Sequence, residues 1–210
     1  MSASSLSQFI ERHHQAWLKG LGHAPVSDKE RDGPALLQRD SEGLAQWQAQ
    51  PQSPQARFGN IAEAMELTLH PDLARFYGEF YAGPLQFDSA FGAGELLQVW
   101  DQTDLDYLQE NLIGHLLMKQ QLKHLPTLFI GLLNDSDAML VLDNADGSVW
   151  LEIPGQRPHQ RIADGLDDLL QQLAPRVELP VVVAPQSAQQ LGLLARLKRM
   201  WQHIKPGRRG

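Results

Sequence analysis

The 210-residue chain contains no cysteine, so disulfide bonds and thiolate chemistry are excluded, and a reducing compartment fits this composition. It also lacks a run of about 18 uncharged apolar residues, the length that a membrane-spanning helix needs. Its longest apolar-rich stretch, residues 109–133, is interrupted between Lys119 and His124. The N-terminus lacks the basic-then-apolar layout of a secretory signal. Together these absences predict a cytosolic protein.

Acidic residues are missing from the last thirty positions, and this absence divides the chain into two differently charged parts. Those positions hold six basic residues, whereas residues 1–180 hold all 25 acids and the other 12 of the 18 Lys and Arg residues. The first part therefore has a formal charge of −13 and the tail +6, within a total of −7. We expect the acidic part to repel nucleic acid and the tail to be drawn to anionic surfaces.

Motifs for catalysis or cofactor binding are also missing. There is no G-x-x-x-x-G-K-[ST] loop and no G-x-S-x-G elbow, and "FGAGELL" lacks the third glycine of a dinucleotide site. The histidines show no H-x-x-x-H or H-E-x-x-H spacing, so no metal site is predicted. His13 and His115 fall on apolar faces and are interpreted as core residues. We expect no cofactor, no small-molecule substrate and no catalytic residue, although an enzyme using a carboxylate pair stays an open alternative.

Hydrophobic periodicity predicts an α+β fold with a mostly antiparallel sheet covered by helices. An amphipathic helix is expected from Leu6 to Trp17, and the short apolar run at 127–133 is typical of an interior strand. The turn sequence "NADG" predicts a hairpin between two strands, and a helix with Ile162 on its inner face follows. Residues 1–176 are predicted to form a single domain, and residues 177–210 a connector and a basic amphipathic C-terminal helix.

Two further helices are predicted between these elements, and residues that favour helix ends mark where each begins and ends. One begins at Asn60 as N-cap, buries Ile61, Met65 and Leu69, and ends before Pro71. The other is a long central helix for which Thr103 is the expected cap. Acids in its first turn and Lys119 and Lys123 at its last turn interact favourably with the two ends of the helix dipole.

Basic residues are absent between Phe76 and Met118, a stretch that contains seven acids. Acids at a helix start are explained by the dipole, and acids in a hairpin by solubility. Their joint distribution nevertheless predicts an acidic face formed by the sheet and the start of the central helix. Such a face suits a basic partner, because charge complementarity speeds encounter and rejects acidic competitors.

The same region resembles a known family. The stretches "QENLIGHL" and "LPTLFI" are similar to the signature of the Syd family of SecY-interacting proteins, within the broader Smi1/Knr4-like superfamily. Supporting matches are "AWLKG", "WQAQP" and "RFYGEFYAG", in family order over roughly residues 6–175. Pro84 departs from the pattern, because relatives usually carry an acid there, and the basic tail has no counterpart in the family pattern.

This resemblance implies a non-enzymatic regulator located peripherally on the cytoplasmic side of the inner membrane, with a soluble pool. It implies docking, through an acidic concave surface, on the basic cytosolic loops of SecY, and monitoring or restraint of improperly assembled channels. Cytosolic loops of membrane proteins carry excess Lys and Arg, which agrees with an acidic partner. The residues assigned to this surface are Glu79, Asp88, Asp101, Asp104, Asp106 and Glu110. An immunity-type protein that neutralises a basic toxin is the alternative.

The tail is interpreted as a contact with the anionic inner-membrane surface, with Trp201 at the interface. Leu193, Leu197 and Met200 belong to one apolar stripe, and the basic residues lie away from it. The residues assigned to this contact are Arg196, Lys198, Arg199, Trp201 and Lys205. An alternative left open is that the tail folds back onto the acidic part of the chain and competes with the partner.

Overall fold

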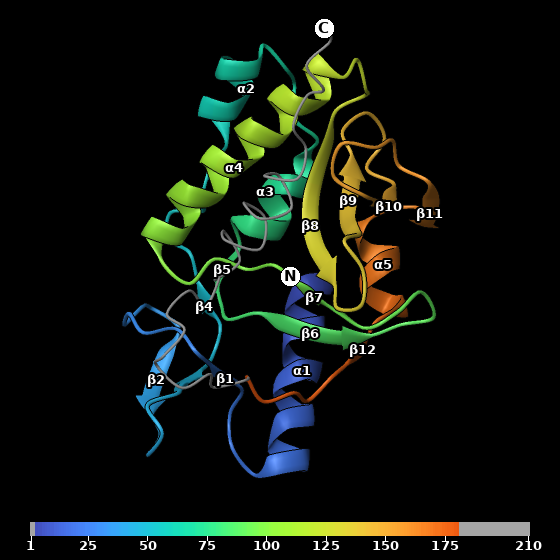
Figure 1. The fold of residues 1–210 in the computed structure, drawn as a ribbon. Helices are drawn as coiled ribbons and strands as arrows, with labels where there is room; N and C mark the ends of the chain where they lie inside the picture. Colours follow the sequence, from blue (N-terminus) through green and yellow to red (C-terminus); the bar gives the residue numbers. More distant parts are fainter. Residues whose placement is uncertain (1–2, 181–210) are drawn as a thin grey trace, which may run out of the picture.

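The structure, a computed structural model, describes residues 3–180 and contains five helices and twelve strands in that range (Figure 1). The helices are α1 (Ser5–Leu21), α2 (Gly59–Met65), α3 (Pro71–Tyr77), α4 (Gln102–Gln121) and α5 (Leu166–Gln172). The predicted C-terminal helix lies outside the described residues, and the division at 176/177 stays a prediction.

The main sheet has seven strands in the order β11-β10-β9-β8-β7-β6-β12, and every neighbouring pair is antiparallel. Its strands are β6 (Leu85–Asp88), β7 (Gly94–Leu96), β8 (Thr127–Leu133), β9 (Met139–Asp143), β10 (Val149–Glu152), β11 (Gln160–Ala163) and β12 (Ala174–Pro175). The smaller sheets are β1 (Val26–Ser27), β3 (Ala45–Trp47) and β2 (Leu36–Arg39), and β4 (Gln50–Pro51) with β5 (Phe80–Tyr81). The α+β class and the mostly antiparallel sheet are confirmed.

Helices cover the main sheet from two sides, which encloses one large apolar core (Figure 1). α4 packs on β8 and α2 packs on α4, whereas α1 contacts α5, β6 and β12. Within the described range, no helix combines the length and the hydropathy that crossing a bilayer requires.

The strongest sequence signals are found where they were predicted. α1 is capped by the Ser4 hydroxyl, buries the expected apolar face including His13, and ends at Gly22 in the left-handed region (φ 75°). Six of the seven residues of β8 are buried, as expected of an interior strand. The hairpin between β9 and β10 is also present.

Three predicted helices have wrong boundaries. α4 is capped by Asp101 instead of Thr103, because the Asp101 carboxylate accepts the Asp104 backbone N–H. α2 starts at Gly59 and ends at Met65, so Leu69 lies beyond it, and Pro71 begins α3 instead of ending α2. Proline fits the first helical turn because its missing N–H has no partner there. Ile162 belongs to strand β11, and α5 starts four residues later.

Candidate partner-binding surface

Asp101 and Asp104 lie at the start of α4, where basic residues of the same chain hold them. Arg31 Nη2 lies 3.2 Å from an Asp101 carboxylate oxygen and 2.8 Å from Asp104, and Lys29 also pairs with Asp104. The two carboxylates are only 16% and 14% exposed. Their charge is therefore largely balanced inside the molecule and is less available to a partner.

The segment that carries Lys29 and Arg31 is held in place by the buried Trp100 ring. Trp100 Nε1 donates to the Arg31 carbonyl oxygen at 2.9 Å. A Cβ atom at Gly33 would overlap the same ring, so only glycine lets the backbone approach this closely. This contact joins residues about seventy positions apart, which periodicity in the sequence does not reveal.

Asp106 and Glu110 lie one turn apart on the solvent side of α4 and are both exposed. Within residues 3–180 neither forms an ion pair, although the Gln102 amide donates to Asp106 at 2.8 Å. The neighbouring helix α2 carries one more exposed acid, Glu63, and the exposed Glu66 caps its C-terminal end. We call these four residues on two packed helices the α2–α4 acids. Glu63 and Glu66 were missed because the sequence argument considered only the stretch from Phe76 onward.

The other two assigned acids lie elsewhere. Glu79 precedes β5 and accepts the Ser4 hydroxyl at 2.7 Å, a bond that ties the start of α1 to this turn. Asp88 ends β6 and lies 3.4 Å from Arg176, next to β12. Figure 1 places β6 far from α2. The six predicted residues come from different elements: four lie on or next to α4, Glu79 precedes β5 and Asp88 ends β6.

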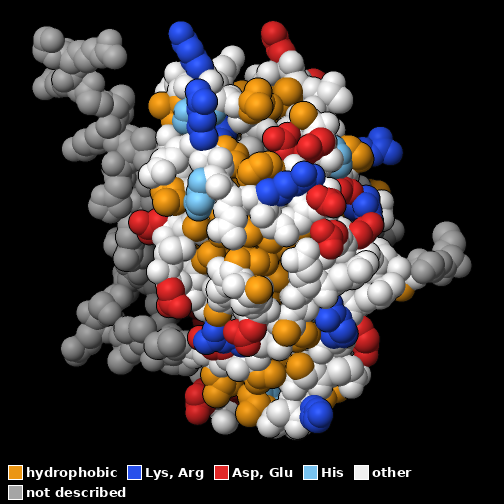
Figure 2. All heavy atoms as spheres, turned by 90° about the vertical axis from the view of Figure 1, so that its right-hand side faces the viewer, with side chains coloured by type: hydrophobic (Ala, Val, Ile, Leu, Met, Phe, Trp, Pro, Cys, Tyr) orange, Lys and Arg blue, Asp and Glu red, His pale blue; other side chains and the backbone are white. Residues whose placement is uncertain are grey.

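A different surface lies on the side of β11 and α5. Figure 2 shows acidic, basic and hydrophobic side chains intermixed on this face. Arg75 lies 2.7 Å from Asp72 and 2.9 Å from Asp167, and Arg161 lies 3.1 Å from Asp164. Because these charges pair with one another, this side offers a basic partner less uncompensated negative charge than the α2–α4 acids do.

A sealed polar network lies at the other end of α4. Lys119 Nζ donates to Glu152 at 2.8 Å, and the Thr127 hydroxyl donates to the same oxygen at 2.9 Å. His115 Nε2 lies 3.0 Å from the Thr127 hydroxyl oxygen, and all four residues are at most 1% exposed. Lys119 occupies the last turn of α4 as predicted, but its charge faces Glu152 in the core.

Burial controls the protonation of this network. Burial, with a further contribution from Lys119, lowers the pKa of His115 to about 3, so the ring is neutral. Burial raises the pKa of Glu152, and the contact with Lys119 opposes that shift. Lys119 follows His115 by four residues and Leu112 by seven, so its place on the buried stripe was visible in the sequence. Since no member reaches solvent, the network stabilises the packing of α4 and cannot meet a substrate.

His13 confirms the interpretation of a core histidine. It is fully buried, and its ring lies 5.9 Å from that of Trp47 and 6.3 Å from that of Trp17, between centroids. Burial lowers its pKa to about 4. Within residues 3–180, no group of three or more His, Asp or Glu side chains is arranged to hold a metal ion.

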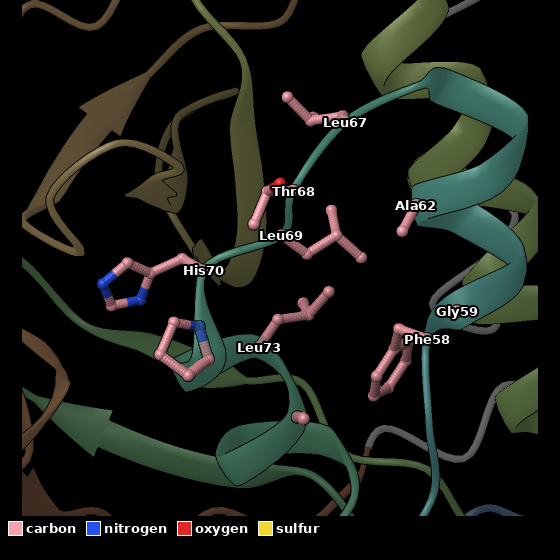
Figure 3. Close-up of a pocket in the computed structure, with 10 residues that line it drawn as sticks. Phe58, Gly59, Ala62, Leu67, Thr68, Leu69, His70 and Leu73 are labelled. Carbon is pink, nitrogen blue, oxygen red and sulfur yellow. The ribbon is translucent and has the colours of Figure 1, made fainter.

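A cleft of about 360 Å³, lined by both apolar and polar groups, lies between α2 and the start of α3 (Figure 3). Phe58 and Ala62 line it from one side and Leu67, Leu69 and Leu73 from the other. The segment between the helices is fixed from behind by the buried Asn144, which accepts the His70 N–H at 3.0 Å and donates to the Thr68 carbonyl at 2.8 Å. The cleft is therefore preformed.

The fold is an α+β domain. Some of its polar side chains form structural contacts inside the domain, and the α2–α4 acids are exposed. The family model described as "Syd protein (SUKH-2)" matches residues 3–175. The chain therefore belongs to the Syd family.

Similar proteins extend this relationship beyond the matched domain. The chain is 44% identical to "Protein Syd" of Shewanella loihica over 214 residues, with 97% of each chain covered. It is 42% identical to "Protein Syd" of Shewanella pealeana and 41% identical to that of Shewanella halifaxensis, each over 209 residues and covering 97% of this chain and 98% of theirs. Only about 3% of the 210 residues lie outside each alignment, so part of the basic tail has a counterpart in these relatives.

Proposed function

We propose that this protein is a non-enzymatic regulator that docks on basic cytosolic loops of SecY at the cytoplasmic side of the inner membrane. There it monitors or restrains improperly assembled channels. The observation that carries the proposal is the exposed pair Asp106 and Glu110, which lies within the stretch that resembles the Syd signature. Cytosolic loops of membrane proteins carry excess Lys and Arg, and four exposed carboxylates that form no ion pair within residues 3–180 complement that charge.

We assign different roles in this contact to the individual acids, according to their exposure and their pairing within the domain. Asp106 and Glu110 are the primary contacts, and Glu63 and Glu66 extend the surface onto α2. Asp101, Asp104 and Glu79 are positioning residues, since their carboxylates bind other parts of the domain. Asp88 lies outside the contact. Exposed ion pairs contribute about 0–1 kcal/mol each, so several must act together and the binding must weaken with salt.

Co-purification with SecY from solubilised inner membranes, at low and high salt, tests this proposal. The full chain should bind at low salt, and Asp106→Lys/Glu110→Lys should abolish most of the binding. The matched control is Asp135→Lys/Asp137→Lys, which makes the same charge change in the exposed loop between β8 and β9. An equal loss of SecY binding in both double variants would show that net charge alone causes the effect. The assignment of the site to Asp106 and Glu110 would then be wrong.

The tail has its own role in this proposal. Arg196, Lys198, Arg199 and Lys205 contact anionic headgroups, and Trp201 inserts at the interface, so that the domain is held near its partner. Each basic residue near an anionic leaflet contributes up to about 1 kcal/mol. Sedimentation with anionic and with zwitterionic vesicles measures this contact, and reversing the four basic residues should remove the preference for anionic lipid.

Neutralisation of a basic toxin is the second candidate, because the same acids suit that partner as well. Binding of a basic nuclease with no retention of SecY under the same conditions would favour it. Retention of SecY that depends on Asp106 and Glu110 would count against it.

A further inference from the structure

The cleft between α2 and α3 has the size and lining of a side-chain receptor. Small-molecule sites span roughly 300–1,000 Å³, so a volume of about 360 Å³ is at the lower limit and suits one large apolar group. Figure 3 shows Leu67, Leu69 and Leu73 on one side of the cleft and Phe58 on the other. An aromatic side chain that fills such a pocket is the usual anchor of an interface.

The margin of the cleft favours a basic segment. Glu63 on α2 and Glu66 directly after it are exposed and close in sequence to the lining residue Ala62. Two basic residues, Arg57 and Arg75, lie beside the lining residues. Arg75 is already paired with two carboxylates, so Arg57 is the base that remains to oppose the acids. The complementary ligand is therefore a large apolar side chain flanked by Lys or Arg.

The sequence of this protein contains such a segment in its own tail. Trp201 stands beside Met200 and among Arg196, Lys198, Arg199 and Lys205, 21 residues beyond Pro180. An extended chain of that length reaches about 70 Å. A domain of this size measures roughly 40 Å across, so the cleft is within reach. The tether also gives the tail a millimolar effective concentration.

We propose that residues 193–205 dock on the α2–α3 cleft, with Trp201 inserted between Phe58 and Leu73. This inference rests on the proposed function, because the docked tail covers acids next to the SecY contact and withholds its own bases from lipid. An anionic bilayer competes for the same tail residues. Arrival at the membrane therefore releases the cleft and the α2–α4 acids together, and the protein is self-blocked away from the membrane.

Hydrogen exchange of the full chain tests this contact without any partner. Amides of residues 66–74 should be protected in the wild type, and Trp201→Ser should raise their exchange roughly tenfold, as loss of one buried aromatic anchor predicts. Gln202→Ser, a neighbouring change that leaves the apolar stripe intact, is the control. Ala62→Met fills the cleft from inside and should reproduce the effect of Trp201→Ser. Unchanged exchange in β8 and β9 shows that a variant is folded.

Vesicles supply the second arm of the experiment. Phosphatidylglycerol vesicles should remove the protection of residues 66–74 in the wild type, and phosphatidylcholine vesicles should leave it. Identical exchange at 66–74 in the wild type and in Trp201→Ser would overturn the proposal. If Ala62→Met removes the protection of residues 66–74 and Trp201→Ser does not, the proposal is also overturned. The cleft would then bind a segment other than the one around Trp201. Because SecY is absent throughout, these results are independent of whether the protein binds SecY.

Discussion

The two ends of α4 use charge in opposite ways. Near its start, Asp106 and Glu110 are exposed and form no ion pair within residues 3–180. In its last turn, Lys119 is buried and ion-paired with Glu152. Exposed ion pairs contribute about 0–1 kcal/mol, whereas breaking a buried pair costs about 3–5 kcal/mol. One helix thus separates residues that hold the fold from residues that are free to meet a partner.

The buried end provides the largest expected effect. Lys119→Met leaves the Glu152 carboxylate buried without its counter-charge, so the free energy of unfolding at pH 7 should fall by about 3–5 kcal/mol. Urea denaturation measures this loss. The double variant Lys119→Met/Glu152→Gln should recover much of it, because no net charge remains in the core. A loss below about 1 kcal/mol in the single variant would show that the pair is not sealed from water.

The buried histidines give the next largest effect through pH. Burial lowers the pKa of His13 to about 4 and of His115 to about 3, against about 6.5 in the unfolded chain. The unfolded state therefore binds more protons between these values. The stabilisation is complete above pH 6.5 and is lost as the pH falls, by up to about 1.4 kcal/mol per unit for each histidine.

Denaturation at pH 7 and at pH 5 checks this dependence. We expect a loss of about 2 kcal/mol for each histidine over that interval. His115→Gln should remove roughly half of the loss. A His115→Gln variant with the full pH dependence would mean that other groups cause it.

The start of α4 should show an intermediate effect. Asp101→Ala removes the N-cap and one contact with Arg31, and an N-cap substitution costs about 0.5–2 kcal/mol. Thr103→Ala is the control, because Thr103 is exposed and does not cap the helix. Thermal unfolding compares the two variants. An equal loss of stability in both variants would show that Thr103 also caps the helix.

The exposed end should contribute least to stability. Asp106→Lys/Glu110→Lys should change the free energy of unfolding by less than about 0.5 kcal/mol, the usual range for surface substitutions. Urea denaturation alongside Lys119→Met provides the comparison. A loss above about 2 kcal/mol would show that these acids are structural, and the two ends of α4 would no longer differ.

Local signals allowed part of this arrangement to be predicted from the sequence. α1, α4, β8 and the β9–β10 hairpin were predicted because apolar spacing and turn residues encode each of them within a short window. Pro71 was misread because proline ends one helix and begins another with equal ease. Lys119 was assigned to the dipole alone, although its spacing from Leu112 and His115 placed it on the buried stripe.

Long-range contacts limited the prediction of the candidate site. Asp101, Asp104 and Asp106 look alike in the sequence, and only the approach of Lys29 and Arg31 separates two of them from the third. Glu63 and Glu66 are far from α4 in the sequence, and only the packing of α2 on α4 brings the two helices together. The negative character of the region was visible from composition, but separating the exposed acids from the paired ones required the fold.

Recognition of SecY by the α2–α4 acids is measured as the affinity of the protein for SecY-containing vesicles. We expect Asp106→Lys/Glu110→Lys to weaken binding at least tenfold at low salt. Asp135→Lys/Asp137→Lys, with the same change in net charge, should remain within about twofold of the wild type. Equal affinities for the two double variants would contradict the account.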